Sequence, residues 1–182
     1  MREAFLELLK TYALKRGKFK LSSGRNSNHY INCKPVTLSG EGLRYVCPML
    51  LQCIEEGSVA VAGMTMGADP LVTGVTICAG FNKQKMDALI VRKEPKGHGT
   101  DAWIEGPTLP KGSVVTVLED VITTGGSSIK AADKLRDMGY TVNRIVSIVN
   151  RQVNGEADSA MEEAGLELIS IYSIEELLHD SE

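Results

Sequence analysis

The segment 114–128 combines residue types that suit the binding of a phosphorylated sugar. Apolar, mostly β-branched residues lead into Glu119 and Asp120, and hydroxyl side chains and two glycines follow before a helical pattern begins at Ser128. A strand, a loop and a helix in this order present backbone N–H groups at the helix N-terminus, where a phosphate can bind. Carboxylates beside such a cradle can accept hydrogen bonds from ribose hydroxyls. The segment therefore predicts a site for a ribose 5-phosphate.

An ordinary strand-to-helix turn, capped by serines, is the other interpretation of this segment. The acidic pair and the adjacent Gly125 and Gly126 favour ligand binding, because a capped turn needs neither of them. The glycine spacing matches neither G-x-G-x-x-G nor G-x-x-x-x-G-K-[ST], which disfavours a dinucleotide site and a P-loop.

The segment 92–99 concentrates positive charge between a proline and two glycines. Arg92, Lys93 and Lys96 are cations, and His98 follows them. The next stretch, 100–112, has no periodic pattern and is expected to be a surface loop. A mobile basic lid of this kind could bind a leaving pyrophosphate and exclude water. A solvated run of charges explains the same composition, so both interpretations stay open at this point.

Three further features could complete a site. Backbone amides of the loop 63–67 could bind a second phosphate, although its glycines could equally serve close packing of a strand on a helix. Arg151 follows a strand pattern, and a guanidinium can pair with a carboxylate through two hydrogen bonds. The turn 22–25 and Tyr30 could cover a flat base, or could form a hairpin without such a role.

A parallel sheet is expected to bring these segments together. Its five predicted strands alternate with helices, which indicates an α/β fold with a mainly parallel sheet covered on both faces. Ligands bind beyond the carboxyl ends of such strands, and the candidate segments follow these ends. The predicted strands are 59–61, 88–91, 114–118, 145–149 and 166–171, and the helices between and after them are 69–79, 128–138, 158–165 and 174–179.

The region before this core predicts a helix over 2–14, ended by Gly17, and then a hairpin over 19–32. Ser39 is expected to cap a helix that Pro48 kinks or splits. Among the later helices, Asp69 and Asp158 are expected as N-caps, and Ser173 with Glu176 as a capping box.

Length and composition limit the class of protein. The 182 residues suit a single domain, and the net charge of −3 disfavours a nucleic-acid partner. Four cysteines without C-x-x-C spacing indicate free thiols in a reducing compartment. The acidic residues near the start disfavour a signal peptide, and Asp69 and Pro70 interrupt the most apolar stretch, so no membrane association is expected.

Residues 117–127 resemble the phosphoribosyl-diphosphate signature of the type I phosphoribosyltransferases. Within that group, Phe19-x-Leu-x-Ser-Gly-Arg-x-Ser-x-x-Tyr30 and Val91-Arg-Lys-Glu-x-Lys-x-His-Gly99 are similar to the orotate phosphoribosyltransferases. The resemblance implies the type I fold over residues 1–182, with a small hood formed mainly by about 1–35. It also implies a cytoplasmic, homodimeric pentosyltransferase of pyrimidine (UMP) biosynthesis. That enzyme converts orotate and 5-phosphoribosyl 1-diphosphate into orotidine 5′-monophosphate and pyrophosphate, with Mg²⁺ held mainly by the substrate.

The same resemblance implies a role for individual residues. Glu119 and Asp120 would hold the ribose hydroxyls, and Lys93 would reach into the partner's site. Lys93, Lys96, His98 and Asp120 are the expected catalytic residues. The diphosphate substrate would be bound by Arg92, Lys93, Lys96, His98, Glu119, Asp120, Val121, Ile122, Thr123, Thr124, Gly125, Gly126 and Ser127, and orotate by Thr123, Arg151 and Tyr30.

The chain departs from the family pattern at two phosphate-binding positions. Many members carry lysine where this chain has Ser22 and Met66. Two other functions stay open for the chain. One is a phosphoribosyltransferase for a purine base, which would have little use for Arg151 facing a carboxylate. The other is a regulatory protein that binds the diphosphate or a nucleotide without catalysis, against which the basic segment argues.

Overall fold

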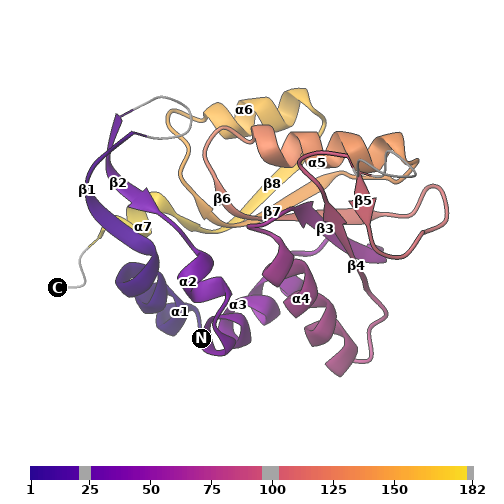
Figure 1. The fold of residues 1–182 in the computed structure, drawn as a ribbon, viewed down its shortest axis with the longest axis horizontal. Coiled ribbons are helices and arrows are strands. Elements are labelled where there is room, and N and C mark those ends of the chain that lie inside the picture. The colour runs from indigo at the N-terminus through magenta and orange to yellow at the C-terminus, as the bar shows by residue number, and fades with distance from the viewer. Residues whose placement is uncertain (21–25, 96–102, 180–182) are drawn as a thin grey trace.

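The computed structural model describes residues 1–20, 26–95 and 103–179, and its centre is a sheet of six strands in the order β5-β4-β3-β6-β7-β8. Five strands are parallel, and β5 alone is antiparallel to its neighbour β4. Helices cover both faces, so the molecule has three layers (Figure 1). The strands are β3 (Ala60–Met64), β4 (Asp87–Val91), β5 (Ile104–Glu105), β6 (Val115–Ile122), β7 (Arg144–Asn150) and β8 (Glu167–Ser173).

The mainly parallel α/β sheet is confirmed, but the expected number of five strands is one too few. The additional strand, β5, lies inside the stretch that was expected to be a surface loop, and it pairs Ile104 with Val91 and Glu105 with Ile90. Two residues are too short for a periodic pattern. The prediction failed there because only the neighbouring strand makes those residues extended.

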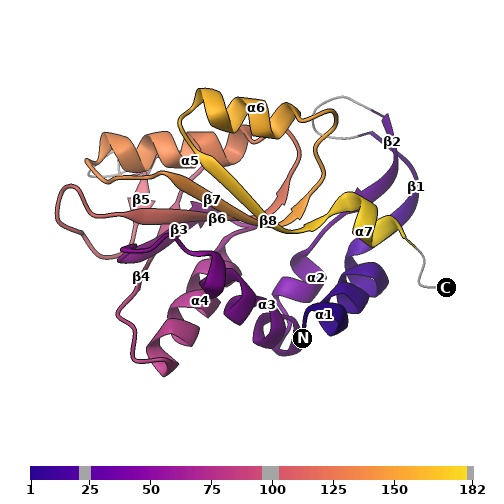
Figure 2. The ribbon, with the colours of Figure 1, turned by 180° about the vertical axis from the view of Figure 1, so that it is seen from behind.

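The two helical layers bury opposite faces of the sheet. Helices α3 (Gly40–Cys53) and α4 (Asp69–Phe81) lie on one face, and α5 (Gly126–Asp137) and α6 (Glu156–Glu163) on the other (Figures 1 and 2). Adjacent residues of the central strand β6 point to different cores: Leu118 packs with the first layer and Val117 with the second. Burial on both faces explains the continuous apolar runs in the sequence.

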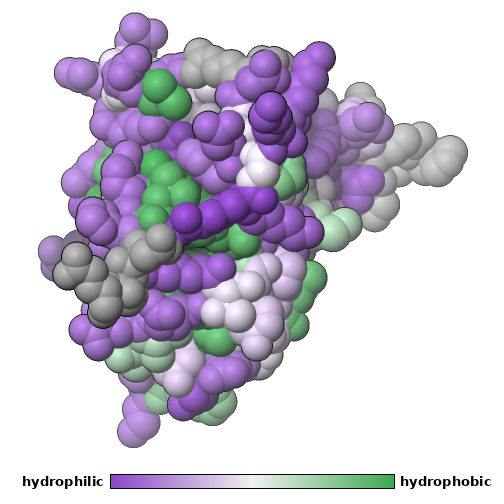
Figure 3. Space-filling view, turned by 90° about the vertical axis from the view of Figure 1, so that its left-hand side faces the viewer, coloured by the Kyte–Doolittle hydropathy of each residue, from purple (hydrophilic) through white to green (hydrophobic). Residues whose placement is uncertain are grey.

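The N-terminal region forms a separate layer of structure beside the sheet. Helix α1 (Arg2–Leu8) continues as a π-helical turn, η1 (Leu9–Ala13), and the chain then enters the antiparallel hairpin of β1 (Leu14–Lys20) and β2 (Asn26–Ile31). The hairpin is confirmed. The face on its side of the molecule is largely hydrophilic around a central patch of hydrophobic side chains (Figure 3).

Several expected boundaries need correction. The first helix ends at Ala13, and Gly17 lies within β1 rather than at a helix end. Pro48 does not split α3, which is continuous because the neighbouring Val46 and Leu50 are fully buried. A short helix that was not expected, α2 (Lys34–Thr37), connects the hairpin to α3.

Two of the four expected caps are confirmed. Ser39 accepts a hydrogen bond from the Gly42 N–H at 2.9 Å, and Ser173 forms the capping box with Glu176 at the start of α7 (Ile174–Leu178). Asp69 and Asp158 are instead helical residues of the first turn, and the N-caps are Ala68 and Gly155. Within the described residues, no helix has the length and apolar character needed to cross a membrane.

Candidate active site

The acidic pair lies at the carboxyl end of β6 and within the strand, which was expected to end at Leu118. The strand continues to Ile122, and the turn before α5 therefore begins only at Thr123. Both carboxylates line the ligand side of the strand end, although Glu119 is only 8% exposed and the Asp120 side chain 14%. A cavity opens at this strand end, and we call it the main cavity because it contains the turn after β6.

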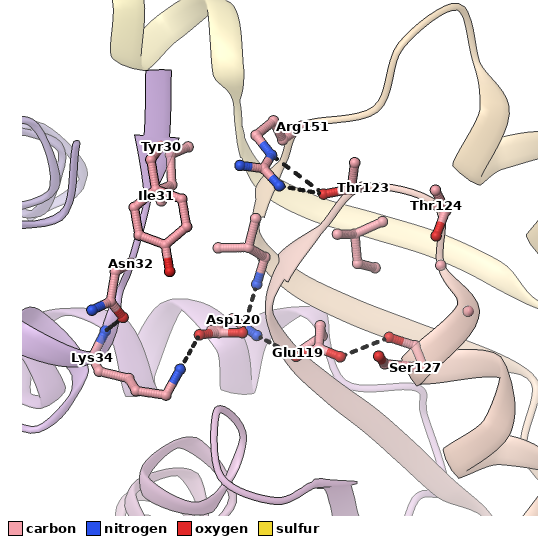
Figure 4. A pocket seen from close by; sticks show the side chains of 15 residues that line it. Tyr30, Ile31, Asn32, Lys34, Glu119, Asp120, Thr123, Thr124, Ser127 and Arg151 are labelled. Atoms are coloured by element: carbon pink, nitrogen blue, oxygen red, sulfur yellow. Dashed lines mark hydrogen bonds and ion pairs between the residues drawn. The ribbon is translucent and has the colours of Figure 1, made fainter. Parts of the chain in front are cut away.

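This cavity has a volume of about 270 Å³ and brings together three groups of predicted site residues: the segment after β6, Arg151 and Tyr30 (Figure 4). Segments more than 90 residues apart in sequence meet here, which confirms the expectation that strand ends and hairpin share one edge of the molecule. The lining residues are Tyr30, Ile31, Asn32, Lys34, Glu119, Asp120, Val121, Ile122, Thr123, Thr124, Gly125, Gly126, Ser127, Ser128 and Arg151.

The turn after β6 has the geometry of a phosphate cradle. Gly125 is the N-cap of α5 with φ +79°, a conformation that glycine adopts without cost. The Ile129 N–H donates to the Gly125 carbonyl at 2.9 Å, so helical hydrogen bonding begins there. The N–H groups of the first turn have no helical acceptor and are available to an anion in the cavity.

The two carboxylates are held by neighbouring donors. Glu119 accepts from the Ser128 hydroxyl at 3.1 Å and from the Asp120 N–H at 3.2 Å. Asp120 accepts from the Val121 N–H at 2.9 Å, and its Oδ2 lies 3.7 Å from the Nζ of Lys34. Burial, followed by the charge of Asp120, raises the pKa of Glu119 to about 8. With its pKa raised toward neutral pH, Glu119 can donate a hydrogen bond to a ribose hydroxyl or accept one, and the carboxyl oxygens of Asp120 add acceptors.

Arg151 lines the cavity wall across from the carboxylates, and hydrogen bonds hold its side chain while one guanidinium nitrogen has no partner among the described residues. Its Nε and Nη2 donate to the Thr123 hydroxyl at 3.3 and 2.9 Å, and its backbone N–H donates to the Ile122 carbonyl at 2.7 Å. Its Nη1 is buried and has no hydrogen-bond partner among the described residues. Figure 4 shows this nitrogen on the side of Tyr30. A buried guanidinium N–H without an acceptor is costly, and an acceptor on a ligand would remove that cost.

A smaller cavity of about 170 Å³ adjoins the first and shares Lys34, Glu119, Asp120 and Ser127 with it. Its other lining residues are Met64, Thr65, Met66, Gly67 and Lys93. The two glycines of this loop have different surroundings. A Cβ on Gly63 would lie 2.2 Å from the Ala68 Cβ, so Gly63 serves packing. A Cβ on Gly67 would lie 2.8 Å from Asp120 Oδ1, so Gly67 keeps the space beside the carboxylate open.

The basic segment is only partly placed at the site. Lys93 lines the smaller cavity, but Arg92 lines neither cavity and instead forms an ion pair with Glu105 at 3.3 Å. Lys96 and His98 lie outside the described residues. The described chain resumes at Trp103, whose carbonyl accepts a hydrogen bond from the Arg92 N–H at 2.8 Å. The Nζ of Lys134 from α5 lies 3.0 Å from the centroid of the Trp103 ring.

Sequence reasoning missed Ile31, Asn32 and Lys34, which line the main cavity. Ile31 is the last residue of β2, and Asn32 and Lys34 follow the hairpin, but no motif or periodicity distinguishes the three from surface residues. Only the direction in which β2 leaves the hairpin takes them to the end of β6. Met66, where many family members carry lysine, lines the smaller cavity with its side chain 63% exposed.

Comparison with known proteins agrees with this geometry. No protein-family model matches the chain. The orotate phosphoribosyltransferase of Thermosynechococcus vestitus is 51% identical over 177 residues, covering 97% of this chain and 93% of the relative. The orotate phosphoribosyltransferase of Nostoc is 46% identical over 177 residues, covering 97% of this chain and 85% of the relative.

Solved structures give the same result. The orotate phosphoribosyltransferase of Mycobacterium tuberculosis in complex with Fe(III) dicitrate superposes with a TM-score of 0.83 at 30% identity, over 97% of this chain and 98% of that one. The same enzyme in complex with 5-phospho-α-D-ribosyl 1-diphosphate gives 0.80 at 28% identity, over 98% and 99%. The sequence resemblance is thereby confirmed, and the chain belongs to the orotate phosphoribosyltransferase family.

Proposed function

We propose that this chain transfers the phosphoribosyl group of 5-phosphoribosyl 1-diphosphate to orotate, giving orotidine 5′-monophosphate and pyrophosphate in pyrimidine (UMP) biosynthesis. The observation that carries this proposal is the pairing of two features in one cavity. A phosphate cradle lies at the start of α5, and a buried guanidinium N–H without an acceptor lies on Arg151 across from it. A sugar phosphate joined to a base that bears a carboxylate satisfies both.

The described residues divide the substrate between them. The turn Thr123–Ser127 binds the 5-phosphate, while Glu119 and Asp120 hold the ribose hydroxyls below it. Thr123 orients Arg151, which binds the carboxylate of orotate, and Tyr30 covers the base. The smaller cavity, with Lys93, receives the diphosphate. Arg92, Lys96 and His98 are proposed to act on the diphosphate as well.

In this arrangement the reaction needs no covalent nucleophile. The bond between C1 of the ribose and the diphosphate oxygen breaks, and the sugar gains oxocarbenium character. N1 of orotate forms the new bond and loses its proton, which the departing pyrophosphate can accept. The carboxylate of Asp120, close to the ring, stabilises the positive charge that develops, and cations in the smaller cavity stabilise the leaving diphosphate. The walls of the main cavity keep the base in line with C1 and limit access of water.

Mg²⁺ is proposed as the cofactor, held mainly by oxygens of the diphosphate. Two carboxylates, Glu119 and Asp120, face the cavities, and Asp120 is already near Lys34. Their oxygen chemistry suits Mg²⁺, and two ligands fit an ion that usually keeps several waters and substrate oxygens. When bound, the ion would neutralise charge on the leaving group.

Assembly and location are proposals of the same kind. A homodimer with shared active sites and a cytoplasmic location follow from the family resemblance. The four cysteines are free in the structure, which supports a reducing compartment. Lys93 already lines a cavity of its own chain, so its predicted action on the partner's site stays a prediction.

One assay tests the function. The protein is mixed with Mg²⁺, phosphoribosyl diphosphate and either orotate or a purine base, and consumption of the base is followed. We expect orotate alone to be consumed. Consumption of a purine but not of orotate would replace the substrate assignment. Binding of the diphosphate without consumption of any base would favour the regulatory alternative.

A further inference from the structure

We propose that Lys34 is a substrate-binding residue that contacts the diphosphate at its attachment to the ribose. This inference deepens the proposed function and rests on it. Sequence reasoning gave Lys34 no role, and the residue belongs to the unexpected helix α2, outside the basic segment 92–99.

The position of Lys34 is the first support. It lines both cavities, together with Asp120, Glu119 and Ser127. The main cavity contains the phosphate cradle and Arg151, and the smaller one contains Lys93 and the glycine loop. A substrate whose ribose occupies the first cavity and whose diphosphate occupies the second must pass the boundary between them. A cation at that boundary faces the phosphate nearest to C1.

The charges of the smaller cavity are the second support. Among the described residues that line it, the acids are Glu119 and Asp120 and the cations are Lys34 and Lys93. A diphosphate brings several negative charges into this acidic surrounding, and each cation there lowers the cost. With Lys34 removed, Lys93 would be the remaining described cation in the cavity.

The contact between Lys34 and Asp120 is the third support. The Nζ lies 3.7 Å from Oδ2, which is longer than the 2.7–2.9 Å typical of a charge-assisted hydrogen bond. The lysine side chain is 40% exposed, whereas that of Asp120 is 14% exposed. Asp120 therefore keeps Lys34 at the cavity boundary without occupying all of its donors. In Figure 4 the Lys34 side chain extends from the start of α2 toward Asp120.

The loop 63–67, which also lines the smaller cavity, contributes no charged side chain to it. Met66 is largely exposed and lines the same cavity as Lys34, and its side chain can neither donate a hydrogen bond nor carry charge. Lys34 thus provides, from the hairpin side, positive charge that the glycine loop lacks in this chain.

The test compares ligands with and without a diphosphate. Calorimetry with Mg²⁺ measures the affinities of phosphoribosyl diphosphate, pyrophosphate and orotidine 5′-monophosphate for wild type, Lys34→Met and Lys34→Arg. Because a hydrogen bond to a charged group is lost, we expect Lys34→Met to weaken binding of phosphoribosyl diphosphate by about 10-fold to 100-fold. Binding of orotidine 5′-monophosphate, which has no diphosphate, should hardly change. Lys34→Arg should retain most of the affinity.

Equal losses for phosphoribosyl diphosphate and orotidine 5′-monophosphate would overturn the proposal, since Lys34 would then act only by positioning Asp120. Unchanged affinity for phosphoribosyl diphosphate would overturn it as well. Lys85→Met, an exposed lysine before β4, is the matched control for loss of one positive charge and should behave as wild type. If Lys34→Met does not fold, as judged by circular dichroism, Lys34→Gln with the same ligands replaces it.

A second variant moves the charge. In Lys34→Met combined with Met66→Lys, the new cation enters the same cavity from the opposite side. We expect the double variant to recover affinity for phosphoribosyl diphosphate relative to Lys34→Met. A double variant that binds no more tightly would contradict a role for charge at this boundary. Failure of wild type to consume orotate would instead overturn the proposed function, so the two outcomes are distinguishable.

Discussion

In the proposed arrangement, Arg151 connects recognition of the base to the rest of the site through the hydroxyl of Thr123. Two of its nitrogens share Thr123 Oγ1, and the third has no partner. The planar guanidinium can therefore hold Thr123 and a ligand carboxylate at the same time, which an ammonium group on a flexible stem does poorly. Specificity for an acidic base thus depends on geometry as well as charge.

Replacement of Arg151 by lysine should separate these contributions. We expect Arg151→Lys to raise the KM for orotate by at least about 10-fold, because one charge-assisted hydrogen bond is lost. Affinity for phosphoribosyl diphosphate, which does not contact this residue in the proposed arrangement, should stay within about twofold of wild type. Steady-state kinetics with each substrate varied, together with calorimetry, checks both values. An unchanged KM for orotate would argue against carboxylate recognition by Arg151.

Glu119 should make the stability of the free protein dependent on pH. Its pKa is raised to about 8 in the folded protein, mainly by burial, and is about 4.3 in an unfolded chain. Between these values the folded state binds a proton that the unfolded state does not, so the free energy of unfolding falls as pH rises through this window. In Glu119→Gln this decrease should be absent. The unfolding free energies of the two proteins should therefore diverge by at most about 1.4 kcal/mol per pH unit.

Denaturant unfolding of both proteins at several pH values measures this difference. Glu162→Gln, which removes an exposed carboxylate of α6, is the control and should follow wild type. Parallel pH profiles of wild type and Glu119→Gln would show that Glu119 is ionised in the folded protein at neutral pH.

At the scale of elements, the site depends on how β6 turns into α5. The turn requires a left-handed residue at Gly125, and a Cβ there would lie 2.6 Å from the Met161 Cε of α6. The N-terminus of α5, which forms the proposed phosphate cradle, therefore packs against α6 at Met161. Phosphate binding and packing of this layer share one backbone conformation.

Gly125→Ala tests this dependence, with Gly155→Ala as its matched control. Both glycines are N-caps with positive φ, +79° and +73°, but a Cβ on Gly155 meets nothing within 4 Å and lies outside the site. We expect each variant to lose about 1 kcal/mol of unfolding free energy through backbone strain. Gly125→Ala should in addition weaken binding of orotidine 5′-monophosphate by about 10-fold, as expected for lost contacts to a charged group. Equal ligand affinity in the two variants would contradict a role of this turn in binding phosphate.

The elements that the sequence predicted well are those whose signal is local. The segment 114–128 carries its strand pattern, glycines and hydroxyls consecutively, so its strand, turn and helix could be anticipated together. Strand β5 and the start of α2 have no such signal: β5 is extended by its pairing with β4, and α2 packs against η1 and α3. Lys34 was missed for this reason, while Arg151 was found because it ends an apolar strand.

At the scale of the whole molecule, one chain already forms both cavities. This makes the location of Lys93 informative, because it lines the smaller cavity together with Asp120 of the same chain. The family resemblance predicts action across a homodimer, whereas the cavity needs no partner to include this residue. In the proposed homodimer, residues of the basic segment other than Lys93 would then reach into the partner's active site.

Mixed dimers decide between these arrangements, once light scattering has shown that the protein is a dimer. Lys93→Ala and Asp120→Ala chains are mixed, unfolded and refolded together. If Lys93 acts on its own chain, both sites of a mixed dimer are defective, and we expect no activity beyond the average of the two parents. If it acts on the partner, one site is intact, and a random mixture should recover about a quarter of wild-type activity. Such recovery would confirm the prediction made from the sequence.

Trp103 has a practical consequence for spectroscopy. It is the only tryptophan of the chain, and it lies where the basic segment returns to the sheet, under the ammonium group of Lys134. Tryptophan fluorescence, excited selectively at the long-wavelength edge of protein absorption, therefore comes from a single ring near the smaller cavity. Ligand titrations and stopped-flow traces can follow the surroundings of that ring in the unlabelled protein, free of background from a second indole.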